Sequence, residues 1–228
     1  MCGAIAVDVI ITDISEDQLG VAKRRCKEAG VSNVKFLLSN AEDLSQFPSN
    51  SMDVVTCCYG YMFCDDRQRA VSEAYRVLKP GGSLVSTCWK KLVGLDLSKA
   101  TMTAVLHGEV PPSPPINPMS LSAPGAFQEL LQGAGFLSND IVSSESTYPF
   151  VFEGDKDYQF KLGTIPIHSK LEEFKADGKL TEIEAGRTAF WALIEEMSTQ
   201  VSPRVAWDST GALHIMDNTF ELTVSKKR

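Results

Sequence analysis

The sequence lacks a long apolar run. No stretch approaches the roughly 18 to 20 apolar residues that a transmembrane helix needs, and Met1 is followed by neither a basic segment nor a cleavable apolar one. The sequence therefore predicts a protein with no membrane span and offers no targeting signal.

Residues that bind metals or form disulfides are few and poorly spaced. Histidine occurs three times, and the six cysteines include no C-x-x-C pair, so neither a zinc site nor a disulfide is expected. Cys57, Cys58 and Cys88 lie in apolar runs and are predicted to be buried thiols that behave as small hydrophobes. This usage predicts an intracellular protein, with the cytoplasm as the first choice and an organelle left open.

An excess of positive charge is also absent. The net charge is −7, and lysine and arginine are scattered along the chain, which argues against nucleic acid or an anionic membrane as the principal partner. With 43% hydrophobic and 22% charged residues, the composition is that of an average globular protein. We therefore expect small-molecule chemistry. The oligomeric state is open.

Apolar segments alternate with amphipathic segments in the first 90 residues. The predicted strands are Ala4 to Ile11 (ending at Thr12-Asp13), Val34 to Leu38, Met52 to Cys58, and Ser83 to Trp89 after a turn at Pro80-Gly81-Gly82. One helix begins at the capping residue Ser15 and stops at Gly30, and another runs from Asp66 to Leu78. This rhythm predicts a Rossmann-like α/β fold with a mostly parallel sheet and flanking helices.

After Lys91 the pattern is weaker. Pro111 to Pro115 predicts an irregular loop. Further helices are expected at 123–134 and 181–200, and strands at 140–144 and 219–225. We expect a single domain over 1–228, with residues 1–91 as its core and 92–228 as substrate-side elements and carboxyl-terminal strands.

Polar residues follow two of the predicted strands. An acid at the carboxyl end of a parallel strand, such as Asp13, can accept hydrogen bonds from both hydroxyls of a ribose, but Asp13 could equally cap the helix that follows. Asn40, Ala41 and Glu42 follow another strand and could meet an adenine edge, or they could form an ordinary polar loop.

The third strand is followed by Tyr59 and Gly60, and glycine permits close approach of the backbone to a ligand. Tyr59, Tyr61 and Phe63 could instead be core aromatics. No nucleophile signature lies near any histidine, but His107 lies in the predicted substrate-side segment and is a weak candidate for a catalytic base. Tyr59 is the other weak catalytic candidate. The segment Arg76 to Gly82 is interpreted as a helix end and a tight turn, with no catalytic role.

Together these motifs resemble the class I S-adenosylmethionine-dependent methyltransferases, specifically the ubiquinone/menaquinone C-methyltransferase type (methyltransferase type 11). The resemblance covers residues 6–90 most strongly. It rests on the acidic motif Thr12-Asp13-Ile14-Ser15, on Asn40-Ala41-Glu42-Asp43-Leu44, on the ending Tyr-Arg-Val-Leu-Lys-Pro-Gly-Gly at 75–82, and more loosely on Leu130 to Phe136.

The resemblance implies S-adenosylmethionine as cofactor, a small-molecule methyl acceptor and a carboxyl-terminal antiparallel strand. It also implies a cofactor site, with Asp13 on the ribose and Asn40 standing where the family commonly has Asp. The implied cofactor-binding residues are Asp13, Ile14, Asn40, Ala41, Glu42, Tyr59 and Gly60. No metal is implied.

The departure from the family lies at the amino terminus. The family places a strand, a D-x-G-x-G-x-G loop and a helix before the acidic motif, whereas only twelve residues precede Asp13, too few for a crossover unit. The first strand and glycine loop are therefore expected to be missing through truncation, which lowers cofactor affinity. The strands on either side must pair with each other or leave backbone groups unpaired, at about 1 to 3 kcal/mol for each one buried.

Three functions stay open on this reading. The first is methyl transfer to a small molecule, in which catalysis rests on holding donor and acceptor in near-attack geometry. The second is an inactive methyltransferase-like fragment or binding module. The third is a nicotinamide-dependent oxidoreductase, since Asp13 could serve either cofactor; the Lys-Pro-Gly-Gly context speaks against it.

Overall fold

A computed structural model describes residues 8–109, 117–200 and 203–228. The chain divides into two compact units, the first made of residues 1–86, 125–142 and 223–228 and the second of residues 87–124 and 143–222. The predicted loop at Pro111 to Pro115 lies outside the described residues, as does the start of the first predicted strand. Whether the two units form the single domain expected above stays a prediction.

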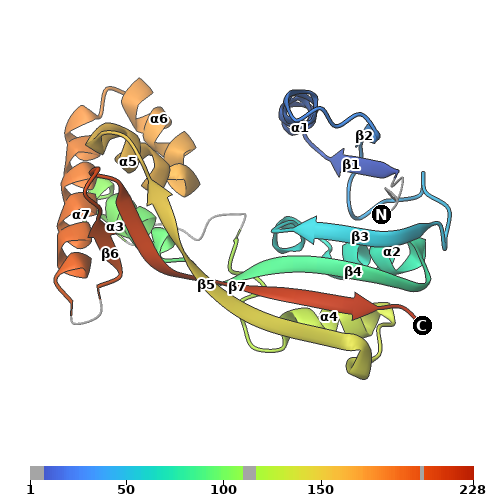
Figure 1. The fold of residues 1–228 in the computed structure, drawn as a ribbon. Helices are drawn as coiled ribbons and strands as arrows, with labels where there is room; N and C mark the ends of the chain where they lie inside the picture. Colours follow the sequence, from blue (N-terminus) through green and yellow to red (C-terminus); the bar gives the residue numbers. More distant parts are fainter. Residues whose placement is uncertain (1–7, 110–116, 201–202) are drawn as a thin grey trace. The chain divides into compact units, whose positions relative to one another are not determined.

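Unit 1 begins with alternating strands and helices (Figure 1). Its elements in chain order are β1 (Val9–Asp13), α1 (Glu16–Glu28), β2 (Val34–Leu38), β3 (Met52–Cys58), the short 3-10 helix η1 (Tyr61–Phe63), α2 (Arg67–Val77), α4 (Ala126–Ala134) and the short 3-10 helix η2 (Ser138–Asp140). Three long strands, β4 (Leu78–Lys91), β5 (Ile141–Phe152) and β7 (Leu213–Lys226), contribute to both units.

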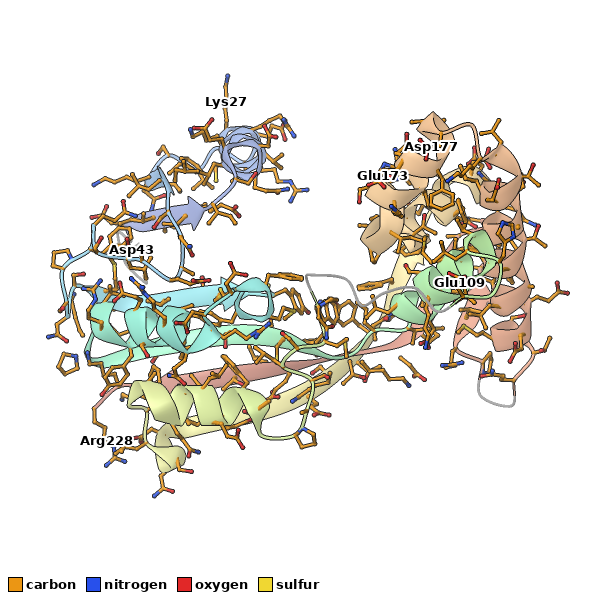
Figure 2. The ribbon with its side chains drawn as sticks, turned by 180° about the vertical axis from the view of Figure 1, so that it is seen from behind. Lys27, Asp43, Glu109, Glu173, Asp177 and Arg228 are labelled. Carbon is orange, nitrogen blue, oxygen red and sulfur yellow. The ribbon has the colours of Figure 1, made fainter. Side chains whose placement is uncertain are left out.

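Helix α1 has the ends that the sequence predicts. The Ser15 hydroxyl oxygen accepts a hydrogen bond from the Gln18 N–H, and Gly30 adopts a left-handed φ of 68° after the last turn. Leu19 is its buried residue, whereas Lys27 projects away from β1 (Figure 2). One face of α1 therefore packs and the other is solvated.

Strands β1 and β2 are parallel, with Val9 opposite Val34 and Asp13 opposite Leu38. These two strands form one sheet, and a second sheet has the order β3-β4-β7-β5, with β6 (Val205–Trp207) paired to β7. The fold is the predicted Rossmann-like α/β arrangement with a mostly parallel sheet and flanking helices. The predicted carboxyl-terminal antiparallel strand is also confirmed, since β7 points opposite to β3 in Figure 1 and pairs antiparallel with β6.

Among the described residues, β1 and β3 do not pair with each other, and each has one edge without a strand neighbour. Apolar side chains on β2 and β3 are also exposed, with Leu38 at 54% and Val54 at 56%. Cys58, predicted to be buried, is exposed on β3, whereas Cys88 is buried as expected. Parallel strands normally have both faces covered, so the described part of unit 1 leaves this region of sheet incompletely paired and incompletely covered.

The predicted turn at Pro80-Gly81-Gly82 is wrong, because β4 begins at Leu78 and continues through these residues. Gly81 has a φ of 83° and donates to the Lys227 carbonyl, while the Gly82 carbonyl accepts from the Lys227 N–H. A β-carbon on Gly82 would lie 2.9 Å from two backbone carbonyl oxygens. The two glycines therefore mark an irregular, tightly packed place within a strand.

The end of β7 is fixed to α2 by a lysine. Lys227 is 9% exposed, and its Nζ donates to the carbonyls of Tyr75 and Leu78 and to Oδ1 of Asn50 at 2.8 to 2.9 Å. A cation at these last carbonyls satisfies the carboxyl end of the helix. Burial lowers the pKa of Lys227.

Unit 2 is built around two packed helices, α3 (Gly94–Val105) and α7 (Leu180–Ser198), and α7 is close to the helix predicted at 181–200. A β-carbon on Gly186 would lie 2.7 Å from the Val105 side chain, so glycine permits the close approach of the two helices. Unit 2 also contains three further helical elements that were not predicted: α5 (Lys156–Gly163), the short 3-10 helix η3 (Ile165–Ile167) and α6 (His168–Ala176). Among the described residues, no helix is both long and apolar enough to cross a membrane.

Candidate functional site

Asp13 is the last residue of β1, and one of its two carboxylate oxygens shapes the start of α1, as one of the two sequence interpretations allowed. Its side chain is half-buried, and Oδ1 accepts the Ser15 N–H at 2.8 Å, which shapes the entry to α1. Its carbonyl accepts the Ser39 N–H at 3.0 Å, which ties the end of β1 to the end of β2. Ile14 beside it is 74% exposed. Oδ1 is thus used structurally, and Oδ2 is the carboxylate oxygen available to a ligand.

The loop after β2 is ordered by its own polar groups. Oδ1 of Asn40 accepts the Glu42 N–H at 2.9 Å, and the Asn40 carbonyl accepts the Asp43 N–H. Oε1 of Glu42 accepts the Asp65 N–H at 2.8 Å, which joins this loop to the segment that follows β3. The structure therefore brings the Asn40–Glu42 loop next to the segment carrying Tyr59 and Gly60.

The turn after β3 is strained and tightly packed. Tyr59 has a φ of 53°, unusual for a residue other than glycine, and a β-carbon on Gly60 would lie 2.5 Å from Sγ of Cys57. A β-carbon at position 60 would therefore have to displace the Cys57 sulfur. Burial raises the pKa of the Cys57 thiol to about 12, so this sulfur is an inert packing group at neutral pH.

Replacing Gly60 by Ala is expected to destabilise the protein by about 1 to 2 kcal/mol, because the new methyl group would displace the Cys57 sulfur. The test is a double-mutant cycle with Cys57→Ala, followed by urea unfolding. The two changes together should cost clearly less than the sum of each alone, since Cys57→Ala removes the clashing atom. Additive costs would show that Gly60 is required for another reason.

The neighbouring aromatics divide between core and surface. Tyr61 is 4% exposed and stacks on Phe127 at 5.9 Å between ring centroids, so it is the core aromatic that the sequence allowed. Burial raises its pKa well above the usual value. Phe63, by contrast, is 46% exposed.

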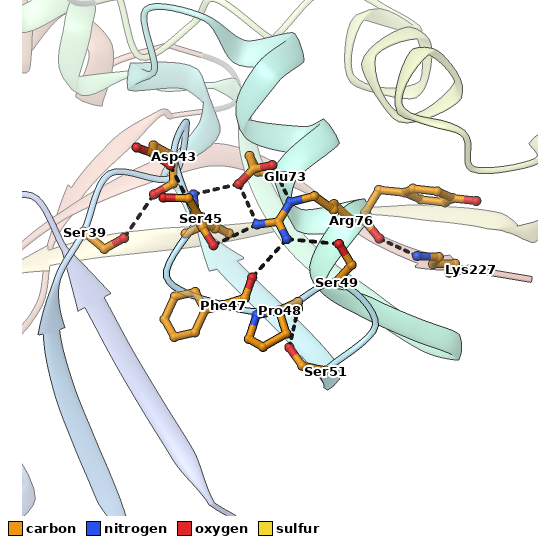
Figure 3. Close-up of polar contacts among 12 residues, drawn as sticks. Ser39, Asp43, Ser45, Phe47, Pro48, Ser49, Ser51, Glu73, Arg76 and Lys227 are labelled. Atoms are coloured by element: carbon orange, nitrogen blue, oxygen red, sulfur yellow. Dashed lines mark hydrogen bonds and ion pairs between the residues drawn. The ribbon is translucent and has the colours of Figure 1, made fainter.

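An ion pair that sequence reasoning missed holds the loop at 44–49 onto α2 (Figure 3). Arg76 pairs with Glu73 at 2.7 Å, and its guanidinium also donates to the carbonyls of Leu44 and Phe47. Oε2 of Glu73 in turn accepts the Leu44 N–H at 2.8 Å. Hydrogen bonds from Arg76 lower the pKa of Glu73. The i, i+3 spacing of Glu and Arg near the helix end was the available signal.

Arg67 is a second residue that the sequence analysis did not select. It is half-buried at the start of α2, and its Nε is buried with no hydrogen-bond partner among the described residues. Its Nη2 makes one long contact, 3.5 Å, to the Met62 carbonyl. A guanidinium with so few hydrogen bonds can donate to an anionic oxygen. An arginine at the start of the helix that follows β3 was the only sequence signal.

His107 lies in unit 2, in the turn that ends α3. It is exposed, has a φ of 55° and donates its backbone N–H to the Ala104 carbonyl. Its assignment as a candidate base stays a prediction, as does the assignment of Tyr59 as a catalytic candidate. The described residues contain no group of three or more His, Cys, Asp or Glu side chains that could hold a metal ion.

Comparison with known proteins agrees with this geometry. Residues 2–86 match the methyltransferase domain family. The ubiquinone/menaquinone biosynthesis C-methyltransferase UbiE of Citrobacter koseri is 37% identical over 94 residues, which are 41% of this chain and 37% of that protein. The matched stretch therefore spans little more than a third of that relative's length.

Two solved structures share the fold across most of the chain. A putative methyltransferase from Bacillus halodurans has a TM-score of 0.53 at 17% identity and covers 96% of this chain and 83% of its own. The [4+2]-cyclase SpnF also has a TM-score of 0.53, at 20% identity, over 98% of this chain and 67% of its own.

The fold, with loops at the ends of β1, β2 and β3, is that of a Rossmann-like α/β domain. More narrowly, residues 2–86, which carry these loops, are similar to the methyltransferase domain family and to a ubiquinone/menaquinone C-methyltransferase, in line with the resemblance that the sequence motifs predicted.

Proposed function

We propose that this protein binds S-adenosylmethionine at the carboxyl ends of β1, β2 and β3 and supports methyl transfer to a small-molecule acceptor. The observation that carries the proposal is the pair of hydrogen bonds joining the three loops. The Asp13 carbonyl accepts from the Ser39 N–H, and Glu42 accepts from the Asp65 N–H. Ligands of open α/β sheets bind at this edge.

Each predicted residue has a role consistent with its contacts. Oδ2 of Asp13 accepts from the ribose hydroxyls, while Oδ1 keeps the Ser15 N–H. Ala41 and the amide nitrogen of Asn40 face the adenine, because Oδ1 of Asn40 is used within its own turn. Ile14, 74% exposed, would cover the nucleoside.

Tyr59 and Gly60 line the methyl-transfer edge, and Arg67 offers a donor for an anionic oxygen of a ligand there. The cofactor, when bound, supplies an electrophilic methyl group on a sulfonium. The protein's share of catalysis is positioning and the exclusion of water.

A comparative titration tests the proposed function. S-adenosylmethionine and S-adenosylhomocysteine are expected to bind, measured by calorimetry, and NADH is expected not to displace them. Competition by NADH at similar concentrations would favour the oxidoreductase alternative, because an acid at this strand end can also hold a nicotinamide nucleotide.

The separated sheets favour a second candidate, a binding module without turnover. Among the described residues, β1 and β3 do not pair. No backbone hydrogen bonds between these two strands therefore fix the loops at their ends relative to one another. Binding of S-adenosylmethionine without methyl transfer to any small-molecule nucleophile offered would support this candidate. Transfer of a labelled methyl group would exclude it.

A further inference from the structure

Unit 2 contains a cavity of about 380 Å³ between α5, α6 and α7. Sites for small molecules usually range from about 300 to 1,000 Å³, so the cavity is large enough for a small ligand. It is formed by residues 157–187 alone and shares no residue with the site proposed above.

The cavity has an apolar floor and an apolar lip. Phe160 and Leu171 are each 6% exposed and form its buried part, and Ile183 is half-buried. Leu180 also lines the cavity but is 59% exposed. An occupant that covered Leu180 would remove apolar surface from water, which favours binding.

The polar lining has an unusual charge balance for this acidic chain. Three cations, Lys161, Lys175 and Arg187, line the cavity together with two carboxylates, Asp157 and Glu172. The lining is therefore net positive by one, with His168 counted as neutral, whereas the whole chain carries −7. The cavity is a local site of positive charge.

The cations of the cavity differ in their partners. Arg187 is held by Asp157 at 2.6 Å and lies 4.5 Å above the Phe160 ring. Lys161 and Lys175 have no ion-pair partner within 4.0 Å among the described residues. These two lysines are therefore available to an anion.

Lysines just outside the cavity are paired. Lys170 pairs with Glu173, and Lys179 pairs with Asp177. Figure 2 shows both of these acids on and just after α6. These two lysines therefore differ from Lys161 and Lys175, which line the cavity.

We propose that this cavity binds a small amphipathic carboxylate. Its hydrocarbon part lies on Phe160 and Leu171 and beneath Leu180, and its carboxylate lies at Lys161 and Lys175. The proposal rests on unit 2 alone and holds whether or not the protein transfers methyl groups.

The test compares octanoate with 1-octanol on the full chain, by calorimetry or by ligand-observed NMR. Octanoate is expected to bind more tightly than the alcohol, because only the carboxylate engages the lysines. The double substitution Lys161→Glu with Lys175→Glu should weaken octanoate binding at least about fivefold, since each exposed charge contributes modestly. Lys170→Glu, on the same helix as Lys175 but outside the cavity, should leave octanoate binding unchanged.

A second variant fills the cavity. Ile183→Trp is expected to abolish binding of both probes while helical circular dichroism is retained, because position 183 is half-buried and lines the cavity wall. Equal binding of octanoate and octanol, or equal losses in the Lys170→Glu control and the double variant, would overturn the proposal. Octanoate binding that survives Ile183→Trp would also overturn it.

Discussion

Replacing Asp13 by Asn is expected to weaken S-adenosylmethionine binding about 10- to 100-fold with little change in stability. The amide keeps an oxygen that can accept the Ser15 N–H, so the start of α1 is preserved. It replaces the second carboxylate oxygen with a donor and removes the charge, so the ribose hydroxyls lose charge-assisted hydrogen bonds, which contribute about 1.5 to 3 kcal/mol. Calorimetric titration measures the affinity, and urea unfolding measures the stability.

Two companion variants separate binding from folding. Asp17→Asn removes an exposed acid from the first turn of the same helix and should leave the affinity within about twofold, because it lies away from the strand end. Asp13→Ala should lower both affinity and stability, because it also deletes the acceptor for Ser15. If Asp13→Asn binds the cofactor as the unmodified protein does, Asp13 is a capping residue and the assigned site is wrong.

The sequence predicted the local elements of unit 1 well because their signals are local. Strands β2 and β3 have the predicted bounds, and α1 lies between its predicted cap and its glycine. Caps, glycines and apolar runs act over a few residues, so a single sequence contains them. The turn predicted from the local sequence at Pro80-Gly82 was wrong, because hydrogen bonds to the end of β7 keep these residues in a strand.

For the candidate site, the sequence predicted which residues follow strands but not the contacts that join them. Asp13, Asn40 and Tyr59 each follow a strand, but the hydrogen bonds that join their loops come from tertiary contacts such as that between Glu42 and Asp65. Gly60 was interpreted as a point of ligand approach, and its contact with Cys57 could not be foreseen. The buried Nε of Arg67, which has no hydrogen-bond partner in the described part of the chain, could not be foreseen either, because burial is a property of the folded chain.

Because β1 and β3 do not pair among the described residues, the side chains of α2 contribute more to holding the loops at the strand ends. Where neighbouring strands share a ladder, backbone hydrogen bonds fix the loops at their ends. Among the described residues, β1 and β3 share none. Glu73 and Arg76 hold instead the chain between β2 and β3 at Leu44 and Phe47, directly after the Asn40–Glu42 loop.

Replacing Arg76 by Ala is therefore expected to destabilise the protein by about 2 to 3 kcal/mol and to weaken cofactor binding as well. The change removes the ion pair with Glu73 and the donors to the Leu44 and Phe47 carbonyls. Charged hydrogen bonds contribute about 1.5 to 3 kcal/mol each when buried, and the side chain is 31% exposed, which reduces the total. Urea unfolding measures the loss.

The pH dependence of that loss identifies its cause. Arg76 lowers the pKa of Glu73 below its ordinary value of 4.5. The pair therefore stabilises the fold fully above that value, and this stabilisation disappears as the pH falls through the lowered pKa. The difference between the unmodified protein and Arg76→Ala should shrink over this range, whereas Arg69→Ala, an exposed position on the same helix, should cost under about 0.5 kcal/mol at every pH. A loss for Arg76→Ala that does not depend on pH would mean that its contacts with the loop carbonyls, rather than its pairing with Glu73, hold this part of the site.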